Sequence, residues 1–299
     1  MNTRAHPRGL LAELTAQLGH YIRLMRLDRP IGIWLLLWPT LWGLWISSQG
    51  SPDPWVFTVF VLGAVIMRSA GCVINDFADR NLDGKVSRTR ERPLAAGTVA
   101  PAEAIVLFLA LCMIALGLVL TLNRMTQLLA VGAVVLTVVY PFCKRFFTAP
   151  QLVLGIAFAW ALPMAFAAQT GEIPRLAWLM SLTVVVWALV YDTMYAMVDR
   201  ADDLEAGMRS TAILFGQADV FVISVLQLVM LFALLLVGEV AMLGVWYRLS
   251  VLFSALFMLY QFVLIRKRDP QNCFRAFLNN RHIGATIFAG IALSYIFPD

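Results

Sequence analysis

Charged residues are scarce in this sequence. Asp, Glu, Lys and Arg make up 14% of its 299 residues, whereas hydrophobic residues make up 61% and the mean hydropathy is +0.78. A soluble globular protein needs more polar side chains than this to cover its surface, so the composition excludes that class. The sequence therefore predicts an integral membrane protein.

Cysteine and histidine are also scarce. Their spacing shows no pairs, which argues against a disulfide framework and against a zinc site. The residues concerned are Cys72, Cys112, Cys143, Cys273, His6, His20 and His282. The first 30 residues carry five arginines and lack a continuous apolar core of sufficient length, so we predict no cleavable signal peptide.

Long apolar runs dominate the rest of the sequence. A transmembrane helix needs about 20 apolar residues, and helices are favoured in lipid because they satisfy their own backbone hydrogen bonds. The runs lack the alternating pattern of transmembrane barrel strands. We predict an all-α protein with nine transmembrane helices, at residues 31–48, 54–74, 102–121, 126–142, 149–168, 176–198, 219–237, 247–265 and 282–297.

Positive charges are distributed unevenly between the predicted loops. Of the 23 Lys and Arg residues, 19 fall on the side of the N-terminus and three on the opposite side, which places the N-terminus in the cytoplasm. We predict residues 1–30 as a cytoplasmic segment, with an amphipathic helix over 10–27 on the membrane surface, and 31–299 as a single transmembrane domain. The net charge of +5 then reflects contact with anionic membrane lipids rather than nucleic-acid binding.

Half of the acidic residues fall in two regions near the ends of the predicted helices 54–74 and 176–198. An alignment of these regions at an offset of 124 residues pairs three polar positions: Asn75 with Asp199, Asp79 with Asp203, and Arg68 with Asp192. Because a helix turns by about 100° per residue, positions about 4, 7 and 11 residues apart share a face. We therefore predict pseudo-duplicated halves, each with oxygen ligands near one helix end and an ionisable group about 10 Å deeper.

Two such sets of carboxylates predict a site for a hard divalent cation. Mg²⁺ is usually held by a few carboxylates together with water and substrate phosphates. Cationic side chains near both clusters and in the loop between them suit a diphosphate: they are Lys85, Arg88, Arg92, Lys144, Arg145, Arg200 and Arg209. A Ca²⁺ site and helix-capping carboxylates in a solvated loop are the alternatives, but acidic and basic groups around one cleft favour Mg²⁺ with diphosphate.

Several segments resemble the UbiA superfamily of intramembrane prenyltransferases. The stretch "NDFADRNLD" at 75–83 matches the NDxxDxxxD signature, and "YDTMYAMVDRADD" at 191–203 matches the second aspartate signature. The segments "RPIGIWLLLWPTLWGLW", "YPFCKRFFTAPQLVLGIAFAW" and "RSTAILFGQ" resemble the members that prenylate 4-hydroxybenzoate for ubiquinone biosynthesis. The resemblance extends from about residue 20 over nearly the whole chain.

This resemblance implies a helix bundle around a chamber, in the bacterial inner membrane, with the active site facing the cytoplasm. It also implies Mg²⁺-dependent transfer of a polyprenyl group from polyprenyl diphosphate to the ring carbon next to the phenolic hydroxyl. The residues expected to bind Mg²⁺ are Asn75, Asp79, Asp83, Asp199 and Asp203. Those expected to bind the diphosphate are Lys144, Arg145, Arg88, Arg92 and Arg209, and those expected to act in catalysis are Asp199, Arg145 and Asp192.

The chemistry also follows from the residues themselves. An allylic diphosphate ionises when positive charge stabilises its leaving group, and water must be kept from the resulting carbocation. Aromatic residues in the predicted spans could form an apolar wall and stabilise the cation with their π faces: Trp34, Trp38, Phe77, Tyr140, Phe158, Trp160 and Tyr191. Packing and membrane-interface roles are the alternative for Trp34 and Trp38.

Arg68 and Asp192 lie within predicted spans, where ionisable side chains are costly and usually paired or functional. We predict that Arg68 receives the carboxylate of the aromatic acceptor, a role for which Arg145 competes. Asp192 would polarise or deprotonate the phenol, and Tyr195 would contact the same substrate. A purely structural ion pair between Arg68 and Asp192 is the alternative.

Two further functions fit parts of the pattern. A UbiA-type enzyme with a naphthoate, homogentisate, haem or chlorophyllide acceptor would share both aspartate signatures. A secondary transporter would account for the internal repeat and the charges within the spans. The flanking segments and the deep Arg68 favour 4-hydroxybenzoate, and the sequence lacks the paired Gly- and Pro-broken helices expected of a transporter.

Overall fold

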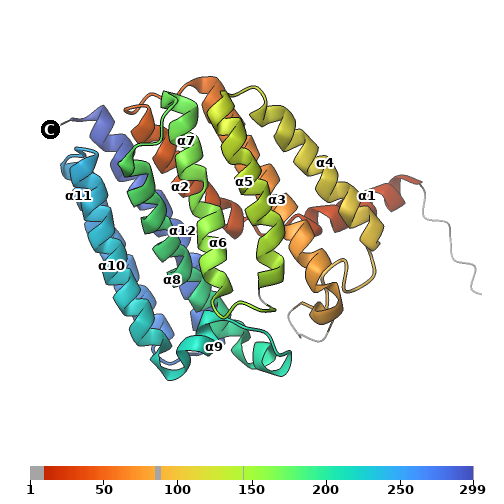
Figure 1. Cartoon of the computed structure of the whole chain (residues 1–299). Helices are drawn as coiled ribbons and strands as arrows, with labels where there is room; N and C mark the ends of the chain where they lie inside the picture. Colours follow the sequence, from red (N-terminus) through yellow and green to blue (C-terminus); the bar gives the residue numbers. More distant parts are fainter. Residues whose placement is uncertain (1–9, 85–88, 144, 299) are drawn as a thin grey trace, which may run out of the picture.

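The protein is all-helical across the residues that the computed structural model describes, which are 10–84, 89–143 and 145–298. The helices run along most of the described chain, and most of them are joined by short connections (Figure 1). They are α1 (Leu10–Leu24), α2 (Ile31–Ser47), α3 (Pro54–Asp83), α4 (Pro101–Val119), α5 (Arg124–Cys143), α6 (Pro150–Ala159), α7 (Ala161–Thr170), α8 (Arg175–Glu205), α9 (Thr211–Phe215), α10 (Asp219–Val240), α11 (Val245–Ile265) and α12 (Pro270–Ile296). A short 3₁₀ helix, η1 (Gly216–Ala218), precedes α10.

Six of these helices form a closed ring. In order around it, α2 packs on α3, α3 on α5, α5 on α6, α6 on α8, α8 on α12, and α12 on α2. Two indole hydrogen bonds support the closure: Trp42 Nε1 donates to the Gly284 carbonyl at 3.1 Å, and Trp187 Nε1 donates to Asn280 Oδ1 at 3.0 Å. In this order α3 and α8, which contain the two aspartate signatures, occupy opposite positions.

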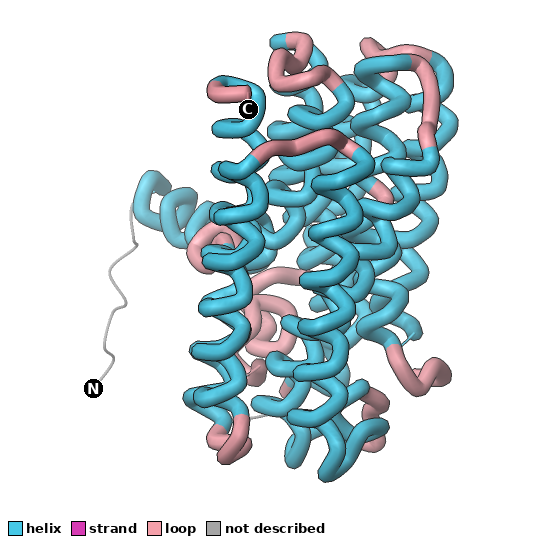
Figure 2. Tube along the Cα trace, turned by 90° about the vertical axis from the view of Figure 1, so that its left-hand side faces the viewer, coloured by secondary structure: helices cyan, strands magenta, loops and turns pink. Residues whose placement is uncertain are grey.

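The remaining long helices pack around this ring. Helix α4 packs on α3, while α10 and α11 pack on α8 and α12 respectively (Figures 1 and 2). Helix α1 lies at the edge of the bundle and is inclined to the long helices (Figure 1); it contacts α3, and Tyr21 donates to Glu103 of α4 at 3.2 Å. A helix at 10–27 was predicted, and its observed end at Leu24 is followed by a turn in which Arg26 has a φ of 58°.

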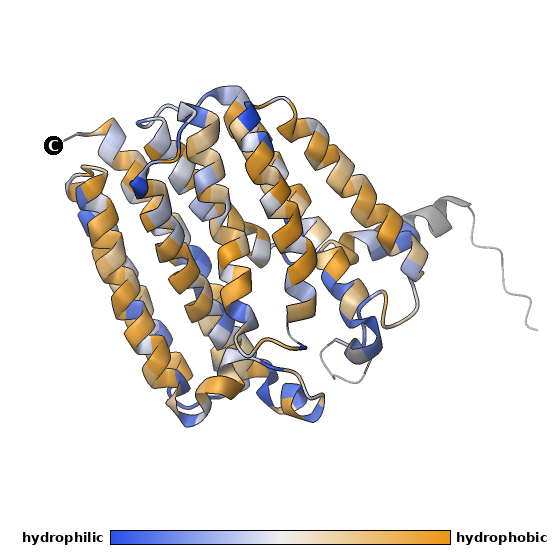
Figure 3. Ribbon diagram, in the orientation of Figure 1, coloured by the Kyte–Doolittle hydropathy of each residue, from blue (hydrophilic) through white to orange (hydrophobic). Residues whose placement is uncertain are grey.

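Seven stretches of the described chain are long and apolar enough to cross a membrane, and the flanks of the bundle are correspondingly hydrophobic (Figure 3). The stretches are Pro54–Asn81, Pro101–Val119, Arg124–Cys143, Pro150–Thr170, Arg175–Glu205, Thr211–Val240 and Val245–Ile265. The chain is therefore an integral membrane protein. Each of the nine predicted ranges overlaps one helix or a pair of helices. However, Ile31–Ser47 is shorter than these seven stretches, and α12 is not one of them. The count of nine transmembrane helices therefore stays a prediction.

Helices α3 and α8 extend well beyond their predicted ends. The predicted spans stopped at residues 74 and 198, where the apolar runs end, whereas the helices continue to Asp83 and Glu205. A helix satisfies its backbone hydrogen bonds in water as well as in lipid, so loss of hydrophobicity does not terminate it. Both aspartate signatures therefore lie on helical turns that extend these spans.

Two other helix boundaries also differ from the prediction. The predicted span 149–168 is divided at Trp160 into α6 and α7, and Pro163 explains the break because its nitrogen cannot donate to the Ala159 carbonyl. Helix α12 begins at Pro270 rather than at residue 282. Asp269 caps it by accepting from the Asn272 backbone N–H at 3.0 Å, and proline is favoured at the first helical position.

Gly284 allows α12 to approach α2 and α8 closely, as small residues do in membrane bundles. A Cβ at this position would lie 2.5 Å from Trp38 Cδ1 and 2.8 Å from Trp187 Cη2.

We expect Gly284→Ala to lower the free energy of unfolding by about 1–3 kcal/mol through overpacking, measured as a lower Tm in detergent. Gly63→Ala is the matched control, because nothing lies within 4 Å of its added Cβ. Equal Tm values for the two variants would contradict this packing role.

Candidate active site

The Arg68 guanidinium lies inside the helix ring. A Cβ on Gly32 of α2 would lie 2.4 Å from Arg68 Nε, and the guanidinium carbon is 5.7 Å from the centre of the Phe158 ring on α6. Arg68 Nη1 donates to Cys72 Sγ at 3.0 Å. The guanidinium also interacts electrostatically with Tyr140 of α5 and with Tyr191 and Asp192 of α8. Residues of its own helix and of four other ring helices therefore surround this charge.

The structure thus brings together Arg68 and Asp192, which the sequence repeat had aligned. Both side chains are partly exposed, and their electrostatic interaction joins α3 to α8 across the ring. Tyr195, one turn further along α8, packs on Phe277 of α12 with ring centres 4.8 Å apart. An arginine within a span needs compensating groups, and the surrounding aromatic and acidic side chains supply them.

The first signature occupies the last turns of α3. Asp76, Asp79 and Asp83 are buried, while Asn75 is half-buried. Burial and the neighbouring charges of Asp76 and Asp79 raise the pKa of Asp83, whereas Arg92 opposes that rise. A carboxylate whose ionised form is disfavoured in this way is stabilised by a cation that joins the cluster.

Asp76 holds together three segments of the chain. Arg26, between α1 and α2, donates to both Asp76 oxygens at 3.0 Å, and Arg92, between α3 and α4, donates to Asp76 at 3.1 Å. Arg92 also donates to Asp83 at 2.9 and 3.1 Å. This ion-pair network places Arg92, a predicted diphosphate ligand, against the first signature. Nothing in the sequence beyond its positive charge pointed to Arg26.

The second signature occupies the end of α8, where Asp199 and Asp203 are half-buried. Arg200 pairs with the fully buried Asp219 at the start of α10, and Arg268 binds the same carboxylate at 2.9 Å. Arg200 is therefore committed to a structural contact between α8 and α10. Asp219 was not among the predicted site residues, and no repeat or motif pointed to it.

The connection between α5 and α6 lies between the two signatures. Arg145 Nη2 donates to the Ala78 carbonyl of α3 at 2.7 Å, and Arg209 Nη1 donates to the Phe146 carbonyl at 2.6 Å. Two of the predicted diphosphate ligands are thus fixed near the first signature and near the segment after α8. Lys85, Arg88 and Lys144 lie outside the described residues.

The predicted metal ligands lie on two helices, α3 and α8. Among the described residues, no group of three or more His, Cys, Asp or Glu side chains is arranged to hold a metal ion. The buried carboxylates of α3 nevertheless suit Mg²⁺, which is commonly bound by one or two carboxylates with substrate phosphates supplying further oxygens. The arrangement fits a metal that arrives with a diphosphate.

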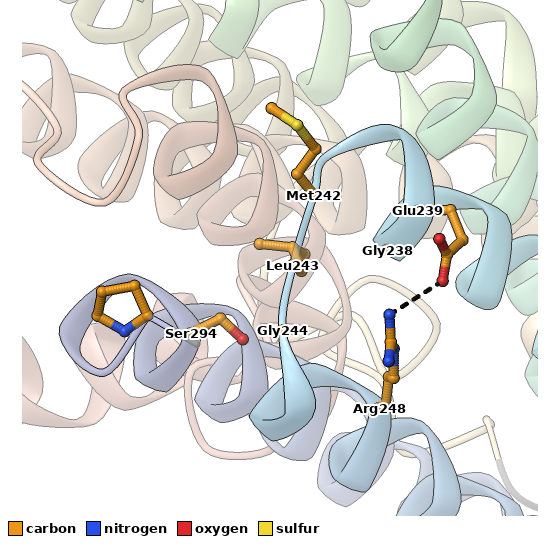
Figure 4. A pocket seen from close by; sticks show the side chains of 8 residues that line it. Gly238, Glu239, Met242, Leu243, Gly244, Arg248 and Ser294 are labelled. Atoms are coloured by element: carbon orange, nitrogen blue, oxygen red, sulfur yellow. Dashed lines mark hydrogen bonds and ion pairs between the residues drawn. The ribbon is translucent and has the colours of Figure 1, made fainter.

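A separate pocket of about 390 Å³ lies at the opposite end of the bundle, between the α10–α11 turn and the end of α12 (Figure 4). Glu239 and Arg248 at its rim form an exposed ion pair at 3.4 Å. Both aspartate signatures lie on the C-terminal turns of α3 and α8, at the end of the bundle away from this pocket. This pocket is therefore no part of the candidate active site.

A comparison with protein-family models matches residues 36–284 to the UbiA prenyltransferase family. The chain belongs to this family. It is 53% identical, over 93% of its length and 96% of the relative's, to the 4-hydroxybenzoate octaprenyltransferase of Aeromonas salmonicida (strain A449). The match with the family confirms the resemblance inferred from the two aspartate signatures and their flanking segments.

Solved structures of UbiA homologues share the fold. The apo structure of a homologue from Aeropyrum pernix K1 has a TM-score of 0.78 at 24% identity, with 88% of this chain and 97% of that chain covered. A homologue from Archaeoglobus fulgidus, solved with GPP and Mg²⁺, has a TM-score of 0.73 at 18% identity, with 93% and 99% covered. These similarities confirm the all-helical membrane fold.

Removal of the Asp76 charge should weaken the ion-pair network at the end of α3. We expect Asp76→Asn to lower the free energy of unfolding by about 2–3 kcal/mol, because Arg26 and Arg92 would lose a buried partner and both are only partly exposed. The measurement is thermal unfolding in detergent. Asp28→Asn is the control, since the exposed Asp28–Arg29 pair at 3.8 Å should change stability by no more than about 0.5 kcal/mol. Similar losses in both variants would refute the structural role of Asp76.

Proposed function

We propose that this protein transfers a polyprenyl group from polyprenyl diphosphate to 4-hydroxybenzoate, at the ring carbon ortho to the hydroxyl, in a Mg²⁺-dependent reaction of ubiquinone biosynthesis. The main support is its 53% identity, over nearly the full length of both chains, to a protein named for this acceptor. The arginine inside the ring and the carboxylates at one end of it are the groups that this chemistry requires. The proposed location is the bacterial inner membrane, with the N-terminus and the active site on the cytoplasmic side.

The two aspartate signatures would bind the diphosphate end of the prenyl donor. Asn75, Asp79 and Asp83 on α3, with Asp199 and Asp203 on α8, would hold Mg²⁺. The bound Mg²⁺ would supply positive charge at the leaving diphosphate. Arg145 and Arg209 flank this end of the ring, where their guanidinium groups would bind phosphate oxygens, as would Lys144 and Arg88.

The interior of the ring would hold the reacting carbon away from water. Phe158 and Tyr191 are almost fully buried, and their ring centres lie 6.5 Å apart on neighbouring helices. Aromatic faces stabilise an allylic cation, while the apolar wall excludes the water that would quench it. The long isoprenoid tail would remain in lipid, which accounts for a membrane location.

The aromatic acceptor would bind between Arg68 and Asp192. The Arg68 guanidinium would pair with its carboxylate, and Asp192 would polarise or deprotonate the phenol, which raises the electron density of the ring carbon that forms the new bond. Their electrostatic interaction across the ring supports this arrangement. Tyr195 would contact the same substrate from the next turn of α8.

The decisive experiment is incubation of membranes containing the protein with 4-hydroxybenzoate and polyprenyl diphosphates of several lengths. We expect a ring-prenylated acid that requires Mg²⁺ and disappears when the metal is chelated. Asp79→Asn should raise the Mg²⁺ concentration needed for half-maximal rate by about 10-fold or more, because one charged ligand is lost. The exposed Glu205→Gln is the control. Absence of a prenylated acid under all conditions, or a preference for another aromatic acceptor, would overturn the proposal.

Loss of the Arg68 charge should affect the acceptor more than the prenyl donor. We expect Arg68→Met to raise KM for 4-hydroxybenzoate by about 10- to 100-fold, because a charge-assisted hydrogen bond to the carboxylate is lost. KM for the diphosphate should change little. Arg124→Met, on an exposed arginine at the opposite end of the bundle, is the control. An unchanged KM for the acid would assign its carboxylate to another residue, such as Arg145.

A further inference from the structure

Tyr191 of α8 has a buried hydroxyl group that lacks a hydrogen-bond partner among the described residues. The side chain is 2% exposed and is held by aromatic rings on three sides. Its ring lies 5.6 Å from that of Trp187, at 89°, and 6.5 and 6.3 Å from those of Phe158 and Phe277. The hydroxyl therefore has little freedom to turn toward another partner.

Packing alone does not explain this hydroxyl. A buried hydroxyl without a partner destabilises the folded protein, and phenylalanine would fill the same space without that cost. Tyr247 of α11 provides the comparison within this chain: it is equally buried, but its hydroxyl donates to the Leu234 carbonyl at 2.9 Å. The fold satisfies one buried tyrosine and leaves the other unsatisfied.

A second unsatisfied donor lies next to Tyr191. Arg68 Nε is buried and also lacks a partner among the described residues. The same Phe158 ring lies against both groups, 5.7 Å from the Arg68 guanidinium carbon and 6.5 Å from the Tyr191 ring centre. The two side chains interact electrostatically across the ring of helices. Two buried donors, from α3 and α8, thus lie against the same aromatic ring, and neither has a hydrogen-bond partner among the described residues.

A single group with two acceptor oxygens, such as a carboxylate, would satisfy both donors. We propose that Tyr191 is a specificity-determining residue whose hydroxyl donates to the carboxylate of 4-hydroxybenzoate beside Arg68 Nε. This inference rests on the proposed function, in which Arg68 holds that carboxylate. Tyr191 would favour aromatic acids over phenols without a carboxylate, because such phenols offer the two donors no pair of acceptor oxygens.

Tyr191→Phe removes the hydroxyl and keeps the ring. We expect KM for 4-hydroxybenzoate to rise by about 10-fold, since one hydrogen bond to a charged group is lost, while kcat stays within about 3-fold. The Tm of the substrate-free protein should stay the same or rise, because an unsatisfied buried group is removed. Tyr247→Phe should show the opposite pattern, with a lower Tm and an unchanged KM.

Two dead-end competitors separate the carboxylate from the phenol. Benzoate has the carboxylate without the phenol, and benzamide has the same shape without the charge. Tyr191→Phe should weaken inhibition by benzoate by about 10-fold and leave inhibition by benzamide within about 2-fold. In a double variant with Arg68→Met, Tyr191→Phe should weaken benzoate inhibition by less than it does alone, because both residues would contact the same carboxylate.

An unchanged KM in Tyr191→Phe, or an unchanged inhibition by benzoate, would overturn this inference. In both cases the wild-type protein would still form prenylated 4-hydroxybenzoate with Mg²⁺, so the proposed function would stand. Failure of the wild-type protein to prenylate the acid would instead refute the proposed function itself.

Discussion

The positive charge of Arg68 within a ring of membrane helices constrains much of the structure. Such a charge is costly unless nearby groups compensate it. Gly32 leaves the space that the guanidinium occupies, Cys72 accepts its hydrogen bond, and Phe158 offers a π face. Tyr140, Tyr191 and Asp192 add electrostatic interactions. One side chain therefore imposes requirements on residues of α2, α3, α5, α6 and α8.

At the end of the ring that contains the aspartate signatures, charges are neutralised by ion pairs instead. There, two buried aspartates outside the repeated positions each bind two arginines: Asp76 binds Arg26 and Arg92, and Asp219 binds Arg200 and Arg268. Each cluster ties a signature helix to the connections around it. The acidic residues at this end thus serve two purposes, since some neutralise arginines of the scaffold while those of the shared helix face are proposed to bind metal.

Much of this arrangement could be predicted from the sequence, because membrane spans and helix faces follow simple periodicities. Asp76 follows Asn75 directly and so points about 100° away from the face shared by Asn75 and Asp79, and the structure places Asp76 in an arginine network. Helix ends were harder to predict, because α3 and α8 continue past their apolar runs. The role of Gly32 and the unsatisfied hydroxyl of Tyr191 depend on contacts between helices far apart in sequence, which no local pattern contains.

The short connection between α5 and α6 has a consequence for how the protein can vary. Its arginine, Arg145, binds the backbone of α3, and the carbonyl of Phe146 accepts a hydrogen bond from Arg209 in the segment that follows α8. Its length therefore helps to set the separation of the two halves at their charged end. Insertions would be tolerated at the α10–α11 turn, at the opposite end of the bundle. The α5–α6 connection instead behaves as a spacer, whose length must be kept even where the sequence around it changes.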